Sequence, residues 1–157
     1  MRDKSKSRGT FYEDFLVGQL LDHHWGRTLN AGDNSLFTTL TLHFNPRYLN
    51  ADFARAEGYD DILINPMLLF DTVFGLSVED CSEKGGAFLG IDDLEFLEPA
   101  YPGDTISARS TVIGLREPTS RPTHGIVTWQ TEGFRQGNRK LLCFQRSNLV
   151  LKRSQAR

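Results

Sequence analysis

The sequence has few of the features that mark specialised classes of protein. It has two cysteines, Cys81 and Cys143, too few for a disulfide scaffold, although a single bond between them stays open. The absence of a Cys-x-x-Cys pair argues against a thiolate zinc site. No apolar run is long enough to span a membrane, and none follows the charged N-terminus as in a secretion signal. We therefore expect a cytoplasmic protein with no membrane partner.

The sequence also has no large excess of charge of either sign. A formal net charge of −2 over 157 residues gives no field that would attract nucleic acid. We assign residues 1–10, which are polar and basic, to a disordered N-terminal tail, and residues 11–153 to one domain with its own core. His23, His24 and His124 lack the spacing of metal ligands, so we expect no metal, and nothing in the sequence indicates a cofactor.

The first half of the chain predicts one strand and two short helices. The strand is expected over 20–30. Apolar residues spaced by 3, 4 and 7 predict a helix within 30–44, with Asp33 as its N-cap. A second short helix is expected over 50–58.

The strongest helical pattern covers 64–80, where Asn65 can cap the helix and Pro66 suits its first turn. It is apolar on nearly every face, so we expect a buried helix. The chain beyond it predicts strands at 87–104, 105–117, 124–135 and 140–152. A buried helix needs an apolar surface, which an antiparallel sheet provides. The predicted fold class is therefore α+β, with the sheet wrapped around a central helix.

Three stretches resemble the MaoC-like (R)-specific enoyl-CoA hydratase/dehydratase family of the hotdog fold. They are NADFA after Asn45-Pro46, the helix after ILINPM, and FLGIDDLEFLEPAYPGDTI. The last is similar to the family signature Gly-x-x-x-[Val/Leu]-x-Phe-x-x-Pro-x-x-x-Gly-Asp-Thr. Residues 115–147 further resemble the subgroup that includes mesaconyl-CoA hydratases. The resemblance implies a single hotdog domain, a homodimer or dimer of dimers, and hydro-lyase activity on an acyl thioester of CoA or a carrier protein.

The catalytic loop departs from the family pattern. When the family's Gly-Asp-x-Asn-Pro-x-His loop is aligned through Asn45-Pro46, His43 replaces the aspartate and Tyr48 replaces the histidine. The resemblance therefore makes His43 the candidate general acid/base and Tyr48 its partner. An imidazole is a good base near neutral pH, whereas a phenol is a better donor. Alternatively, His43 is a polar residue satisfied at a helix end, and Tyr48 packs with its hydroxyl hydrogen-bonded.

Four residues are candidates for substrate binding: Asn45, Arg47, Asn65 and Met67. Arg47 can meet a substrate carboxylate or a CoA phosphate, or lie in solvent; the two asparagines can instead organise a loop and cap a helix. Pro66 stands where the family has a glycine whose N–H faces the thioester oxygen, and proline has no N–H. An oxyanion site would then depend on the amides of Met67 and Leu68 and on the partial positive charge of the helix start, with the Asn65 side chain as a further donor.

Other functions stay open. The exchanged residues fit a diverged cyclase, isomerase or dehydratase that acts on a small molecule without CoA. The chain also fits a non-catalytic partner subunit of an active hotdog chain. A hotdog thioesterase is disfavoured, because Asp71 is the only acidic residue in the interior of the predicted central helix.

Overall fold

A single antiparallel sheet forms the body of the protein. The computed structural model describes residues 9–155, so most of the predicted 1–10 tail lies outside the described residues. The strands are β1 (Leu20–Thr28), β2 (Gly85–Phe96), β3 (Thr105–Arg116), β4 (His124–Arg135) and β5 (Arg139–Leu151). They pair in the order β1-β3-β4-β5-β2, which leaves β1 and β2 at the edges.

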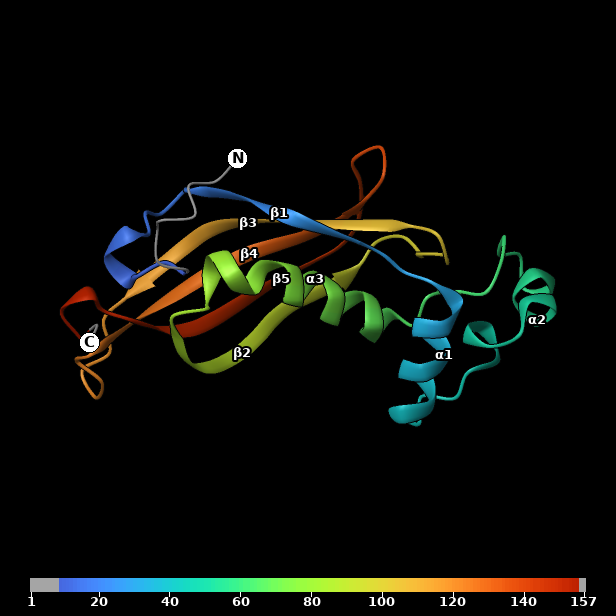
Figure 1. Ribbon diagram of the computed structural model, residues 1–157, viewed down its shortest axis with the longest axis horizontal. Coiled ribbons are helices and arrows are strands. Elements are labelled where there is room, and N and C mark those ends of the chain that lie inside the picture. Colours follow the sequence, from blue (N-terminus) through green and yellow to red (C-terminus); the bar gives the residue numbers. More distant parts are fainter. Residues whose placement is uncertain (1–8, 156–157) are drawn as a thin grey trace.

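The helices precede most of the sheet in the chain. They are α1 (Ala31–Leu40), α2 (Ala51–Ala56) and α3 (Pro66–Cys81), with 3-10 turns η1 (Tyr12–Asp14), η2 (Pro46–Tyr48) and η3 (Arg153–Gln155). The helix α3 lies across one face of the sheet, and α1 and α2 lie beyond its N-terminal end (Figure 1). The predicted α+β class and the predicted central helix are confirmed.

The N-terminus of α1 differs from the prediction in one residue. Asn30, and not Asp33, is the N-cap, because its side-chain oxygen accepts from the Asp33 amide at 2.9 Å. Asp33 is the third helical residue, and its carboxylate accepts from the Asn30 amide in return. The pair forms a capping box, in which the acidic residue comes three positions after the cap.

Side chains from α3 enter two apolar clusters on the sheet. Leu69 and Val73, in its N-terminal half, pack with a group of buried residues that includes Phe144. Cys81, at its C-terminal end, packs with Trp129 and Phe15, whose rings meet edge to face at 5.4 Å. The sheet is thus covered along its length by one helix, and this burial is the main stabilising contribution.

A buried polar chain holds the C-terminal end of α3 against three strands. His23 Nδ1 lies 2.9 Å from a carboxylate oxygen of Asp80, and His23 Nε2 lies 2.8 Å from Ser110 Oγ. The Ser110 hydroxyl is in turn 2.9 Å from that of Thr131. A carboxylate accepts, so Nδ1 donates to Asp80, and in the neutral imidazole Nε2 then accepts from the Ser110 hydroxyl. His23 therefore links β1 to α3 and β3, and the structure places it outside the loop that carries His43.

Two further findings concern the described residues as a whole. Cys81 and Cys143 are both free thiols. Within residues 9–155, no helix has the length and apolar character needed to cross a membrane.

The contact between α3 and β4 leaves no room for an extra methyl group at Gly133. A Cβ there would lie 2.5 Å from a Val73 methyl. We expect Gly133→Ala to lower the free energy of unfolding by about 1–3 kcal/mol, because a packed core resists added volume. Denaturant unfolding measures it. The control is Gly75→Ala on α3, where a Cβ meets nothing within 4 Å, and which should be stabilising by about 0.5–1 kcal/mol. Equal effects at both positions would contradict this packing argument.

Candidate functional site

The N-terminus of α3 is held by Asn65, which is completely buried. Its side-chain oxygen accepts from the Met67 amide at 3.0 Å, and its side-chain nitrogen donates to Thr38 Oγ1 at 3.2 Å. In the structure, Asn65 therefore caps the helix, which is the alternative to a role in substrate binding. The structure also corrects the expectation that the Met67 amide is free for an oxyanion, because that donor is already used by the cap.

Asn34 ties this helix start to the loop before it, whereas its place in the sequence indicates only a helix-cap residue. Its side-chain nitrogen donates to the carbonyl oxygens of Tyr48 at 2.9 Å and Leu63 at 2.8 Å. Its side-chain oxygen accepts from the Asn65 amide at 2.7 Å. One fully buried side chain therefore joins α1, η2 and the start of α3.

The loop brings His43 and Tyr48 together. Their rings meet edge to face, with centroids 5.4 Å apart and an interplanar angle of 73°. His43 is exposed, and it follows Leu42, whose φ of +56° lies in the left-handed region that favours glycine. Tyr48 is only 8% exposed, and burial raises the pKa of its hydroxyl. Tyr48 therefore remains a proton donor at neutral pH.

Asn45 and Arg47 take part in contacts within the chain. The Asn45 side-chain oxygen accepts from the Arg47 amide at 3.0 Å, which caps η2. The Arg47 guanidinium forms an ion pair with Glu57, and this hydrogen bond holds the pKa of Glu57 below its usual value. The same guanidinium lies 6.0 Å from the centroid of the Tyr59 ring. Arg47 therefore already has a carboxylate partner within the chain, without any substrate carboxylate.

A hollow of about 260 Å³ opens beside the N-terminus of α3. It is lined by Tyr48, Tyr59, Leu63, Ile64, Pro66, Leu69, Phe96, Leu97, Glu98, Pro99 and Ala100. Of the predicted catalytic and substrate-binding residues, only Tyr48 is in this lining. No local pattern in the sequence assigns residues 96–100 to this lining, because they end and follow β2 and reach this end of the molecule only through the sheet.

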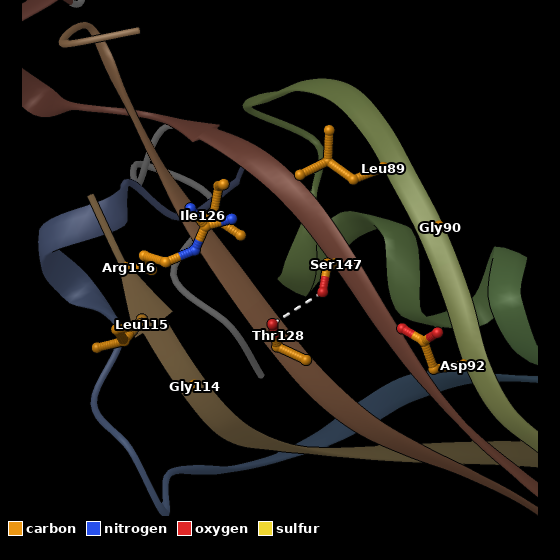
Figure 2. A pocket seen from close by; sticks show the side chains of 9 residues that line it. All are labelled: Leu89, Gly90, Asp92, Gly114, Leu115, Arg116, Ile126, Thr128 and Ser147. Atoms are coloured by element: carbon orange, nitrogen blue, oxygen red, sulfur yellow. Dashed lines mark hydrogen bonds between the residues drawn. The ribbon is translucent and has the colours of Figure 1, made fainter. Parts of the chain in front are cut away.

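A second hollow, of about 420 Å³, lies on the other face of the sheet (Figure 2). Its floor includes Thr128 and Ser147, whose hydroxyls hydrogen-bond to each other at 2.8 Å. Thr128 alternates with Val127 and Trp129, which face α3, so the hollow faces away from that helix. It contains none of the predicted site residues. The hollow at the start of α3 is therefore the candidate site.

No group of three or more histidine, cysteine, aspartate or glutamate residues within 9–155 is arranged to hold a metal ion. The chemistry available at the candidate site is that of Tyr48, Tyr59, the arginine-paired carboxylate of Glu98 and the nearby imidazole of His43. The helix N-terminus adds a partial positive charge, which favours negative charge. These groups can donate or accept a proton and can polarise a carbonyl oxygen.

Residues 1–157 match the model of the mesaconyl-CoA hydratase family. The chain belongs to the mesaconyl-CoA hydratase family. A mesaconyl-CoA hydratase from Haloarcula hispanica is 40% identical over 156 residues, which are 99% of this chain and 44% of that protein. The chain thus spans less than half the length of this relative. The resemblance to MaoC-like hydratases, and to this subgroup of them, is confirmed.

Solved structures agree on the fold. One of them is a MaoC domain protein from Chloroflexus aurantiacus that is described as a dehydratase. The two structures superpose with a TM-score of 0.90 at 34% identity, and the match covers 99% of this chain and 44% of the Chloroflexus chain. A protein from Mycobacterium tuberculosis with a double hotdog fold gives a TM-score of 0.83 at 24% identity, covering 95% of this chain and 46% of that one. The predicted hotdog fold is confirmed.

Removal of the Asn34 side chain tests whether one residue organises the site. Asn34→Ala leaves the buried Asn65 amide and two carbonyl groups without their partner. We expect unfolding free energy to fall by at least about 2 kcal/mol, measured by denaturant unfolding. The control, Asn30→Ala, removes an exposed cap at the start of the same helix and should cost about 1 kcal/mol. A loss at Asn34 no larger than that at Asn30 would contradict the central role of Asn34.

Proposed function

We propose that the chain is a hotdog unit of an enzyme that adds water to, or removes it from, the acyl group of an acyl-CoA thioester. The match of the whole chain to the mesaconyl-CoA hydratase family carries this proposal. The hollow beside the start of α3 supports it, because Tyr48 and the helix N-terminus both border one apolar space. Such a space suits an acyl group, with the polar groups placed to orient it.

The reaction requires three contributions from the protein. Water must lose a proton as it attacks the β-carbon, the α-carbon must receive a proton, and charge on the thioester oxygen must be stabilised. We assign the proton transfers to His43, with the protonated hydroxyl of Tyr48 as a hydrogen-bond donor. Pro66 lacks an N–H, and the Met67 amide is used by Asn65, so the oxyanion would rely on Tyr48, the Leu68 amide and the dipole of α3.

A second hotdog unit would complete the site, and we propose a homodimer or a dimer of dimers. Strand β2 is an edge of the sheet. Three large apolar side chains of β2 and the one that follows it are exposed: Phe88, Leu89, Phe96 and Leu97. An exposed apolar edge strand invites pairing with another chain. Phe96 and Leu97 also line the hollow, so a partner seated on β2 would lie next to the acyl group.

His43→Ala tests the assignment of the acid–base group. If His43 transfers the proton, the variant should lose roughly 10²- to 10⁴-fold in hydration rate, followed with crotonyl-CoA and mesaconyl-CoA through the loss of the conjugated thioester absorbance. The matched control is His24→Ala, which removes an exposed imidazole on β1 and should leave the rate unchanged. Full activity in His43→Ala would remove His43 from the mechanism.

A second candidate function is a non-catalytic unit that pairs with an active hotdog unit, on the same polypeptide or another. Three observations favour it: the loop lacks the family's aspartate and histidine, His43 is not in the lining of the hollow, and the Met67 amide is occupied. Under this reading the partner supplies the proton-transfer groups, while this chain contributes fold and binding surface.

Co-expression separates the two candidates. The chain would be produced with a hotdog chain that carries an intact Gly-Asp-x-Asn-Pro-x-His loop, and the mass of the purified assembly measured. A non-catalytic unit should form a mixed complex whose hydration activity is lost with the partner's aspartate or histidine and is unaffected by His43→Ala. A self-associated assembly that is active alone would exclude this role.

A further inference from the structure

A row of small residues crosses the sheet on its outer face, the face that points away from α3. The strand register lines up four residues on neighbouring strands: Gly114, Thr128, Ser147 and Gly90. We call this line the outer row. All four residues lie in the lining of the hollow of about 420 Å³, and Figure 2 shows them in a line from β3 to β2. The outer row is therefore the floor of a groove that runs across the strands.

Neither glycine of the outer row is required by the fold of a single chain. Both have φ outside the left-handed region that favours glycine. A Cβ at Gly90 would meet nothing within 4 Å, and one at Gly114 would be in ordinary contact with the Cβ of Thr128, at 3.6 Å. A glycine within a strand weakens it, and often marks a place where another backbone or a ligand approaches closely. The outer row thus permits a close approach that this chain does not itself make.

A bulged apolar residue stands beside each of these glycines. The strand pairing skips Ile113 next to Gly114, and it skips Leu89 next to Gly90. A bulge re-aims a side chain, and here the two side chains are 41% and 48% exposed. Covering both ends of the outer row would remove this apolar surface from water, which is favourable.

The centre of the outer face carries little charge. Gln130 and Gln145, which form the next pair along β4 and β5, are uncharged like the outer row itself. The charged residues one further pair along, Arg109 and Glu132, have partners within the chain, which are Asp22 and Lys140. Depletion of charge at the centre of a surface, with charged residues around it, is typical of a protein–protein interface.

The outer face also has the size of a stable interface. Five strands spaced by about 4.8 Å, with 12 residues in each of β3 and β4, give a surface of about 20 Å by about 40 Å. This area of about 800 Å² is close to what each partner contributes to an interface of standard size. A partner with a matching sheet face would therefore bury enough surface for stable association.

The outer row begins at the middle of the edge strand. Strand β2 runs from Gly85 to Phe96, so Gly90 lies near its centre. If two copies of β2 pair antiparallel over their full length, the two-fold axis of that pair passes beside Gly90. A further two-fold axis along the outer row then crosses the first at a right angle, and the two axes together close an assembly of four chains.

The charges beside the outer row suit a second copy of the same face. Asp92 and Arg116 lie one pair beyond the row on opposite sides of it, since Asp92 pairs with Gln145 and Arg116 with Ile126. Within residues 9–155 neither forms an ion pair. Rotation about the outer row turns the facing chain end for end along its strands. The side that carries Asp92 would therefore face the side that carries Arg116 in the other copy, which is a complementary arrangement.

We propose that the outer face is the surface by which two edge-paired dimers pack back to back into a dimer of dimers, with the outer rows of facing chains on one another. The partner is a second copy of this chain. The inference rests on the edge pairing of β2 in the proposed function, and it names the face that joins the dimers. The candidate site at the start of α3 stays outside this interface, because it does not lie on the outer face.

Thr128→Arg tests the outer row, because a two-fold axis there places position 128 opposite its own copy. We expect the purified protein to have the mass of four chains in light scattering, and Thr128→Arg to have the mass of two. The facing like charges should raise the dissociation constant of the four-chain assembly at least about tenfold. The control, Thr119→Arg, lies exposed in the loop between β3 and β4 and should keep four chains.

The opposite charge at the same position provides a rescue. Thr128→Asp should also dissociate to two chains, since two carboxylates would then face each other. Mixed in equal amounts with Thr128→Arg, it should recover the mass of four chains, because a dimer of one variant can pack on a dimer of the other. A variant that only distorted the sheet would not be rescued by its counterpart.

The outcomes separate this interface from the edge pairing on which it rests. A mass of two chains for the unchanged protein at every concentration would overturn the back-to-back packing and leave the edge pairing intact, whereas a single chain would overturn both. Four chains that neither variant at Thr128 dissociates, or that Thr119→Arg dissociates as well, would overturn the assignment to the outer row. Absence of recovery in the mixture would overturn the two-fold arrangement. None of these masses depends on hydration activity.

Discussion

The structure depends on a helix, α3, that buries one face along the sheet and is held by polar contacts at both its ends. A helix leaves amide donors free at its start and carbonyl acceptors free at its end, and leaving them buried without partners is costly. At the start of α3, Asn65 accepts from the Met67 amide and is itself held by Asn34. At the far end, the Ser82 amide donates to the Val78 carbonyl oxygen, and the anchor to the sheet is a side chain, the Asp80 carboxylate, which is tied through His23 to Ser110. These two anchors fix α3 in place, and the candidate site is built on the first of them.

The local patterns of the sequence predict most of the fold. The run of apolar residues with Asn65 and Pro66 at its start predicts α3, because capping and burial are read from consecutive residues. The alternating segments after Gly85 predict the four later strands for the same reason. The one error in capping, at Asp33, arises because both ends of a capping box are favourable residues, and only the backbone shows which of them precedes the helix.

The candidate site was less predictable, because its geometry depends on contacts between distant residues. Asn34 looks like a helix-cap residue in the sequence, and its three hydrogen bonds to Tyr48, Leu63 and Asn65 follow only from the fold. The apolar wall from Phe96 to Ala100 reaches the hollow through the pairing of β2 with β5. The proximity of His43 and Tyr48, by contrast, is implied by the resemblance of this segment to the family's catalytic loop, and the rings do meet.

The exchanged residues of the loop and the charge of the hollow point in the same direction. A site that stabilises an oxyanion needs donors that are not already satisfied, and this chain uses the Met67 amide for a cap and has proline where an N–H would stand. The described arginines around the hollow are likewise paired within the chain, with Glu57, Glu98 and Asp104. In both cases, the polar groups are already paired with other groups of this chain. What it presents to a ligand is a mainly apolar space with two tyrosines and the arginine-paired carboxylate of Glu98, so a further charged group that the reaction requires must come from His43 or from the unit that pairs with this one.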